Sequence, residues 1–106
     1  MSTEGVALGI RIKEPSRPSH AVVVMTRRLS DLIEAAAPIR CAAEDGGLDA
    51  TTAQLDRIIA HLDVLRTVLV VEGDEHVEVA RAYADVCEDR MLAHAVYIGK
   101  ARRGRA

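Results

Sequence analysis

Aromatic side chains are scarce in this chain of 106 residues, which contains Tyr83 and Tyr97 but no Phe and no Trp. The core must therefore be assembled from Leu, Val, Ile, Ala and Met, a composition that suits closely packed helices. The same scarcity gives little surface for stacking nucleic-acid bases or flat cofactors, because such stacking relies on aromatic rings. We expect no cofactor.

Cysteine and long apolar runs are scarce as well. Cys41 and Cys87 are too few to indicate a disulfide framework. No apolar run approaches the roughly 20 residues that a membrane-spanning helix needs. The N-terminal sequence MSTEGVALGIRIK lacks the basic start and the long apolar segment of a signal peptide. We therefore expect a cytoplasmic protein with reduced thiols and no membrane partner.

The chain also lacks the short motifs of common catalytic and phosphate-binding sites. It has no GxGxxG, no phosphate-binding glycine loop with Lys, no GxSxG and no HExxH. Carboxylate pairs such as Asp31 and Glu34 are expected on solvated helix surfaces, where nothing raises a pKa for general acid catalysis. We therefore expect a non-enzymatic protein with no catalytic residues.

Two parts of the chain contain residue types that bind metals. Cys87 and His94 fall on one side of a predicted helix, but two helical turns, about 10 Å of rise, separate them. The segment EGDEHVE at 72–78 lacks the ligand spacing of a calcium loop. We interpret the first as core packing and the second as an acidic turn, so no metal site is predicted. His61 is interpreted as a residue that flanks a helix–helix contact.

Apolar residues recur at steps of three and four over three stretches, which is the spacing of one helical face. This pattern predicts helices at residues 20–43, at 51–72, and from Asp74 to near Gly99. The three stripes are Val22, Met25, Leu29, Leu32, Ala36, Ile39 and Ala43; Leu55, Ile58, Leu62, Leu65 and Leu69; and Val77, Ala80, Ala84, Cys87, Met91 and Ile98.

Capping and breaking residues predict where these helices begin and end. The predicted N-caps are Ser19, Thr51 and Asp74. Gly73 and Gly99 are the predicted helix ends. Pro38 predicts a kink or an early end of the first helix, because its ring crowds the preceding turn.

The links between the predicted helices are short, which favours antiparallel neighbours. We therefore predict an all-α fold, an antiparallel three-helix bundle at residues 19–99, with an extended N-terminal arm at 1–18 and a flexible basic tail at 100–106. Within the arm, residues 5–13 alternate like a short β-strand. That strand would pair with its twin in a dimer, join a partner's sheet, or lie over the helices.

Apolar residues also form second stripes, at Val64, Val68 and Val71 and at Val79, Tyr83 and Val86. A helix that is apolar on two sides needs partners on two sides. Self-association explains this excess, and burial beneath the N-terminal arm is the alternative. We predict a homodimer that acts as a small interaction module (an adaptor, regulator or inhibitor) for an unidentified protein partner. The predicted interface residues are Val68, Val71, Val79, Tyr83 and Val86.

Charge is unevenly distributed along the chain. Residues 29–99 carry fourteen acidic and five basic side chains, whereas residues 1–28 and 100–106 are both net basic. Basic ends favour contact with phosphates, which makes a nucleic-acid-associated regulator the alternative function. Its candidate contacts are Arg27, Arg28, Lys100, Arg102, Arg103 and Arg105.

Overall fold

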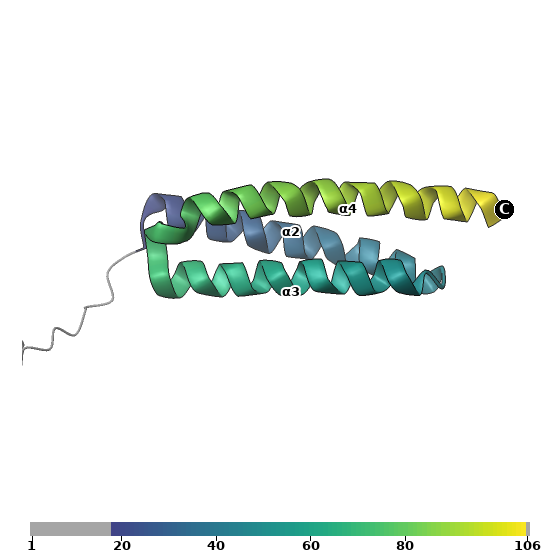
Figure 1. The fold of residues 1–106 in the computed structure, drawn as a ribbon, viewed down its shortest axis with the longest axis horizontal. Helices are drawn as coiled ribbons and strands as arrows, with labels where there is room; N and C mark the ends of the chain where they lie inside the picture. The colour runs from purple at the N-terminus through teal and green to yellow at the C-terminus, as the bar shows by residue number, and fades with distance from the viewer. Residues whose placement is uncertain (1–17, 106) are drawn as a thin grey trace, which may run out of the picture.

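The computed structural model describes residues 18–105, and within that range the backbone is helical almost throughout and contains no strand (Figure 1). The elements are α2 (His20–Asp45), α3 (Asp49–Glu72), the 3-10 turn η1 (Gly73–His76) and α4 (Val77–Arg105). The predicted all-α fold is confirmed over these residues. Apart from Pro18, the predicted N-terminal arm lies outside the described residues, and so does the alternating segment at 5–13.

The helices lie side by side, and each runs opposite to the one before it in the chain (Figure 1). α2 packs against both α3 and α4. A short turn joins α2 to α3, whereas only η1 separates α3 from α4, so residues 49–105 form one helical stretch that folds back on itself. The start of α2 therefore lies at the same end as η1, where the Ser19 hydroxyl donates a hydrogen bond to Asp74. We refer to this end as the η1 end.

The apolar stripes predicted from the sequence form the core. Their members are buried except for Ile39 and Leu65, which are half-buried. Leu29, Leu55 and Leu62 lose all their exposure to solvent. Removing one such side chain from water contributes about 1.5–3 kcal/mol to folding. The burial of these stripes is what holds the helices together.

The predicted cap of α2 is confirmed, whereas the predicted cap of α3 is wrong. The Ser19 hydroxyl oxygen accepts a hydrogen bond from the backbone N–H of Val22 at 3.1 Å. α3 begins two residues before Thr51, at Asp49, an acidic residue that suits the positive end of the helix dipole. The Thr51 side chain is buried within the first turn instead of capping it.

The link between α3 and α4 depends on one glycine. Gly73 has φ of 81°, a conformation that other residues rarely adopt, and its N–H donates to the carbonyl of Leu69. The predicted end of α3 is therefore confirmed. Asp74, a predicted cap, lies inside η1 and accepts the hydrogen bond from Ser19.

The predicted helix end at Gly99 is wrong, and of the two outcomes predicted at Pro38, a kink or an early end, the early end is not found, because burial outweighs local preference. α4 passes through Gly99 to Arg105, and residues 100–105 are helical. A glycine inside a helix costs about 1 kcal/mol, which the burial of the adjacent Ile98 offsets. α2 likewise continues past Pro38, which is exposed, to bury Ala43 on the next turn.

Polar side chains connect the helices outside the core. Arg40 of α2 binds Asp56 of α3 at 2.8 Å, and Arg66 of α3 donates to the Ser30 hydroxyl at 3.1 Å. Contacts of this kind at the surface are individually weak, because water screens the charges and the side chains lose freedom. No helix among the described residues is both long enough and apolar enough to cross a membrane.

Replacing Leu62 by Ala should lower the free energy of unfolding by about 2–5 kcal/mol, because it removes a fully buried side chain and leaves a cavity. Urea unfolding followed by circular dichroism measures this change. Val70→Ala is the matched control on the same helix, since Val70 is 68% exposed, and its effect should stay within about 0.5 kcal/mol. Equal effects of the two changes would contradict the assignment of the core.

Candidate interaction surface

A set of apolar side chains remains in contact with solvent on α3 and α4 after the core is complete. The most exposed of the predicted interface residues are Val71 at 73% and Val79 at 62%. Tyr83 and Val86 are exposed as well, and Val68 is half-buried. We define the α3–α4 face by its members, which are His61, Val64, Val68, Val71, Val79, Tyr83 and Val86. The predicted stripes are thus present on the surface, and their role as an interface stays a prediction.

The stripes on α3 and α4 belong to one continuous surface. The Tyr83 hydroxyl and Nδ1 of His61 are 2.6 Å apart, and the two rings meet edge to face with centroids 5.7 Å apart. This contact fixes residue 61 level with residue 83. Because α3 and α4 are antiparallel, Val64 and Val79 both lie on the η1 side of that contact. The interpretation of His61 as a flanking residue of a helix–helix contact agrees with this position.

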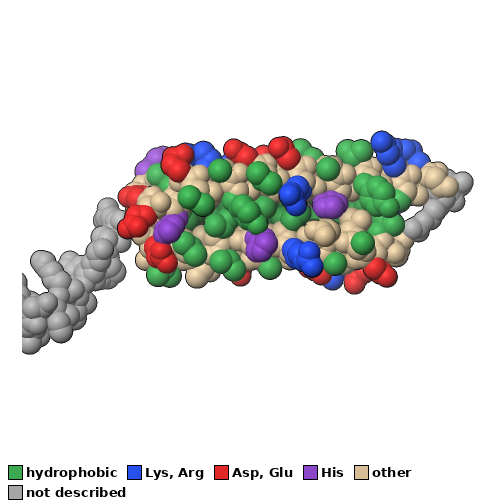
Figure 2. Space-filling model, in the orientation of Figure 1, with side chains coloured by type: hydrophobic (Ala, Val, Ile, Leu, Met, Phe, Trp, Pro, Cys, Tyr) green, Lys and Arg blue, Asp and Glu red, His purple; other side chains and the backbone are tan. Residues whose placement is uncertain are grey.

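The α3–α4 face is largely apolar along its middle, where a few basic and histidine side chains also lie, and acidic at its margins (Figure 2). Figure 2 shows hydrophobic side chains gathered between the two helices, with carboxylates mainly at the η1 end and along the outer edges. Single exposed valines are common on protein surfaces. A contiguous apolar patch with a polar border is typical of a surface that contacts another protein.

Sequence reasoning missed part of the α4 stripe. Continuing the same steps of four and three beyond Val86 leads to Arg90, Ala93 and Tyr97. All three are exposed, Tyr97 at 53%. The three-four spacing itself continues past Val86. The predicted stripe ends at Val86 because the next position, Arg90, is charged.

Arg28, a predicted nucleic-acid contact, is occupied within the protein. Its guanidinium group binds Asp85 at 2.7 Å and Glu88 at 3.2 Å, which connects α2 to α4. The hydrogen bond that Arg28 donates to the Asp85 carboxylate is the main cause that raises the pKa of Arg28 above its ordinary value. Arg28 therefore has less freedom to reach a phosphate than an unpaired arginine.

The other predicted basic contacts lie in two separate parts of the structure, with Arg27 on α2 and the rest in the last turns of α4. Lys100 is twelve residues beyond Glu88, the partner of Arg28, so it lies about 18 Å farther along α4. The side chain of Arg105 lies outside the described residues. The exposed basic candidates are Arg27, Lys100, Arg102 and Arg103. These residues do not make a single basic patch with Arg28.

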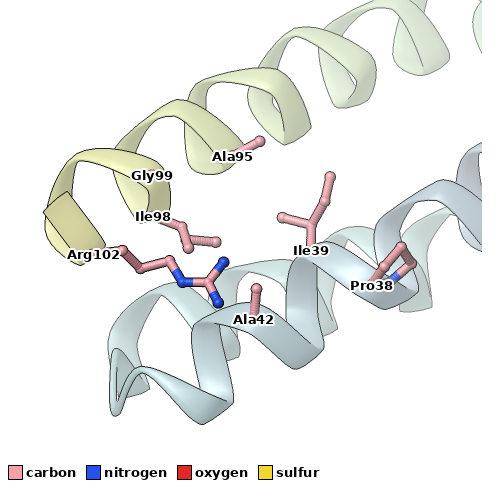
Figure 3. A pocket seen from close by; sticks show the side chains of 7 residues that line it. All are labelled: Pro38, Ile39, Ala42, Ala95, Ile98, Gly99 and Arg102. Carbon is pink, nitrogen blue, oxygen red and sulfur yellow. The ribbon is translucent and has the colours of Figure 1, made fainter.

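A separate apolar pocket lies between α2 and the last turns of α4. Its volume is about 240 Å³, and its only charged lining residue is Arg102. Figure 3 shows the Arg102 side chain extending from α4 toward Ala42 of α2, with Ile39 and Ile98 facing the space between the helices. Nothing in the lining supplies a nucleophile or a general base, so the pocket offers an apolar contact beside one cation.

The residues considered as metal ligands are placed in packing positions. Cys87 and Met91 are buried in the core, and His94 beside them is half-buried. No group of three or more His, Cys, Asp or Glu side chains among residues 18–105 is arranged to hold a metal ion. Burial raises the pKa of the Cys87 thiol, which disfavours its reactive thiolate.

Comparison of the chain with protein-family models, with curated proteins and with solved structures finds no match.

The two thiols should react at very different rates with a maleimide or an aromatic disulfide reagent. Cys41 is exposed and should be labelled at once, whereas Cys87 is buried and should be labelled only when the protein opens. Counting labelled thiols by mass spectrometry, before and after adding guanidinium chloride, measures this difference. Cys41→Ser is the control, and rapid labelling of that variant would show that Cys87 is accessible.

Proposed function

We propose that this protein is a small non-enzymatic protein–protein interaction module, an antiparallel three-helix bundle that acts as a homo-oligomer. In this role it serves as an adaptor, regulator or inhibitor, and the α3–α4 face is its contact surface. The observation that carries the proposal is the exposure of Val64, Val71 and Val79 beside a core that is already complete without them. Their burial in a contact would stabilise the assembly by about 25 cal/mol for each Å² of apolar area removed from water.

Two further features support a contact role. The face is built on long helices and not on loops, so its side chains are presented in fixed order. Tyr83, whose ring combines apolar area with a hydroxyl, lies within the patch and is held by His61. Tyrosine is enriched among the residues that dominate protein–protein contacts.

Placing carboxylates on the face should separate the subunits. Val79→Asp combined with Tyr83→Asp should weaken self-association by more than about thirtyfold, because burying an unpaired charge costs more than about 2 kcal/mol. Sedimentation velocity at micromolar concentration measures the result, and circular dichroism checks that the helices are intact.

Leu92→Asp is the matched control for this pair. Leu92 is also an exposed apolar residue of α4, at 60%, but it lies on another side of the helix. This variant should associate like the unmodified protein. A wild-type protein that is monomeric at micromolar concentration would contradict the proposed homo-oligomer, and equal weakening by Leu92→Asp would contradict the assignment of the face.

A second candidate function is contact with nucleic acid through the basic end of α4. The exposed positions of Lys100, Arg102 and Arg103 on one short helical segment favour it. Replacing these three residues by Ala should abolish salt-sensitive binding to a fluorescent DNA duplex, because each phosphate contact contributes to the salt dependence. Adding Arg27→Ala tests the distant candidate separately. Unchanged binding by the triple variant would contradict this alternative.

A further inference from the structure

The outer stripe of α4 has the same spacing in both directions. Its members are Val79, Tyr83, Val86, Arg90, Ala93 and Tyr97, at steps of four, three, four, three and four. The centre of this series is residue 88. Two copies of α4 that run antiparallel and meet at that level therefore present identical stripes to each other along their whole length. Steps of three and four are also the spacing that lets neighbouring helices interlock their side chains.

In this alignment each bulky side chain meets a smaller or more flexible one. Val79 lies opposite Tyr97 of the second copy, and Tyr83 lies opposite Ala93. Val86 lies opposite Arg90, the only charged member of the stripe. The aliphatic stem of Arg90 can cover Val86 while its guanidinium group stays in water at the edge.

Charge distinguishes this arrangement from a parallel one. The η1 end carries Glu72, Asp74, Glu75 and Glu78, and the far end of α4 carries Lys100, Arg102 and Arg103. Residues 75 and 102 are 27 positions apart, which is about 40 Å along the helix axis. An antiparallel pair places the acidic end of each copy against the basic end of the other. A parallel pair places like charges together at both ends, which is repulsive.

The length of α4 fits the same arrangement. Figure 1 shows α4 extending past the turn between α2 and α3. In an antiparallel pair, this extension lies along the η1 end of the second copy, beside the exposed Val71 and Val79. The extension thus covers the part of the face that is most exposed.

We propose that the α3–α4 face is occupied by a second copy of this chain, with the two α4 helices antiparallel and centred on residue 88. This inference rests on the proposed function and specifies its geometry. Four ion-pairing segments, two acidic and two basic, flank the apolar stripe in the dimer. The dyad axis runs perpendicular to the helices.

Disulfide trapping tests this register in the full chain. The test uses Tyr83→Cys combined with Ala93→Cys in a Cys41→Ser background. In the proposed register, the thiol at position 83 of each copy faces the thiol at position 93 of the other. Mild oxidation therefore yields a covalent dimer on non-reducing gels. Val79→Cys with Tyr97→Cys is a second pair for the same register. Each single cysteine is a control, because its copy across the dyad is about 15 Å away or more along the axis. Arg81→Cys with Leu92→Cys is an off-face control, and neither control type forms the covalent dimer.

Charge reversal tests the end-to-end complementarity. Changing Lys100, Arg102 and Arg103 to Glu makes both ends acidic and weakens the dimer at least about tenfold. Changing Glu72, Glu75 and Glu78 to Lys in that same variant restores opposite ends and recovers the affinity. Sedimentation at low salt measures both steps. Failure of the second set to recover the affinity overturns the proposed alignment.

The possible outcomes distinguish a failure of this inference from a failure of the proposed function. A monomeric wild type overturns both. If Val79→Asp with Tyr83→Asp dissociates the dimer but neither paired cross-link forms, the antiparallel register is overturned and the proposed function is retained. A dimer that is lost on Ile10→Asp and that lacks the cross-links assigns the contact to the N-terminal residues and also overturns the inference.

Discussion

Close contact between small aliphatic side chains is the constraint on which the remaining structure depends. Ala36, Ala80 and Ala84 have no exposure to solvent, and side chains of this size bring helix axes near the short end of the usual 8–10 Å range. The core takes one stripe from each helix, with these alanines lying among larger leucines such as Leu55 and Leu62. The valines of the second stripes have no place in it, which is why they remain on the surface.

Polar contacts align the helices along their length. Three side-chain contacts at successive levels connect α2 and its cap to α3 and η1. They are Ser19 with Asp74, Ser30 with Arg66, and Arg40 with Asp56. Apolar stripes with a repeating three-four spacing pack almost equally well after a shift of seven residues. A shifted pairing would leave these polar partners apart, so contacts of small individual strength select one alignment.

Sequence patterns predicted the core well because helical periodicity averages over many residues. The stripe through Leu55 and Leu62 is buried as expected. Single-residue signals were less dependable, since each is a preference of about 1 kcal/mol that packing outweighs. Ser19 caps α2, whereas Thr51 does not cap α3 and Gly99 does not end α4.

The candidate surface was predictable only as far as periodicity extends. Val79 and Val86 were identified because they repeat, and Tyr97 was missed because Arg90 precedes it. The engagement of Arg28 with Asp85 was not predictable, because it depends on how α2 lies against α4. The identity of the partner leaves no periodic pattern in the sequence. It can be inferred only from the shape and charge of the face that the folded helices form.

The placement of the two tyrosines has a consequence for spectroscopy. The chain contains no tryptophan, and Tyr83 and Tyr97 both lie on the outer stripe of α4 with none in the core. Ultraviolet emission and near-ultraviolet dichroism therefore originate from the solvent side of a single helix. Such signals report on whatever covers that helix, whereas the aliphatic interior contains no aromatic reporter, so its unfolding must be followed through the far-ultraviolet dichroism of the helices.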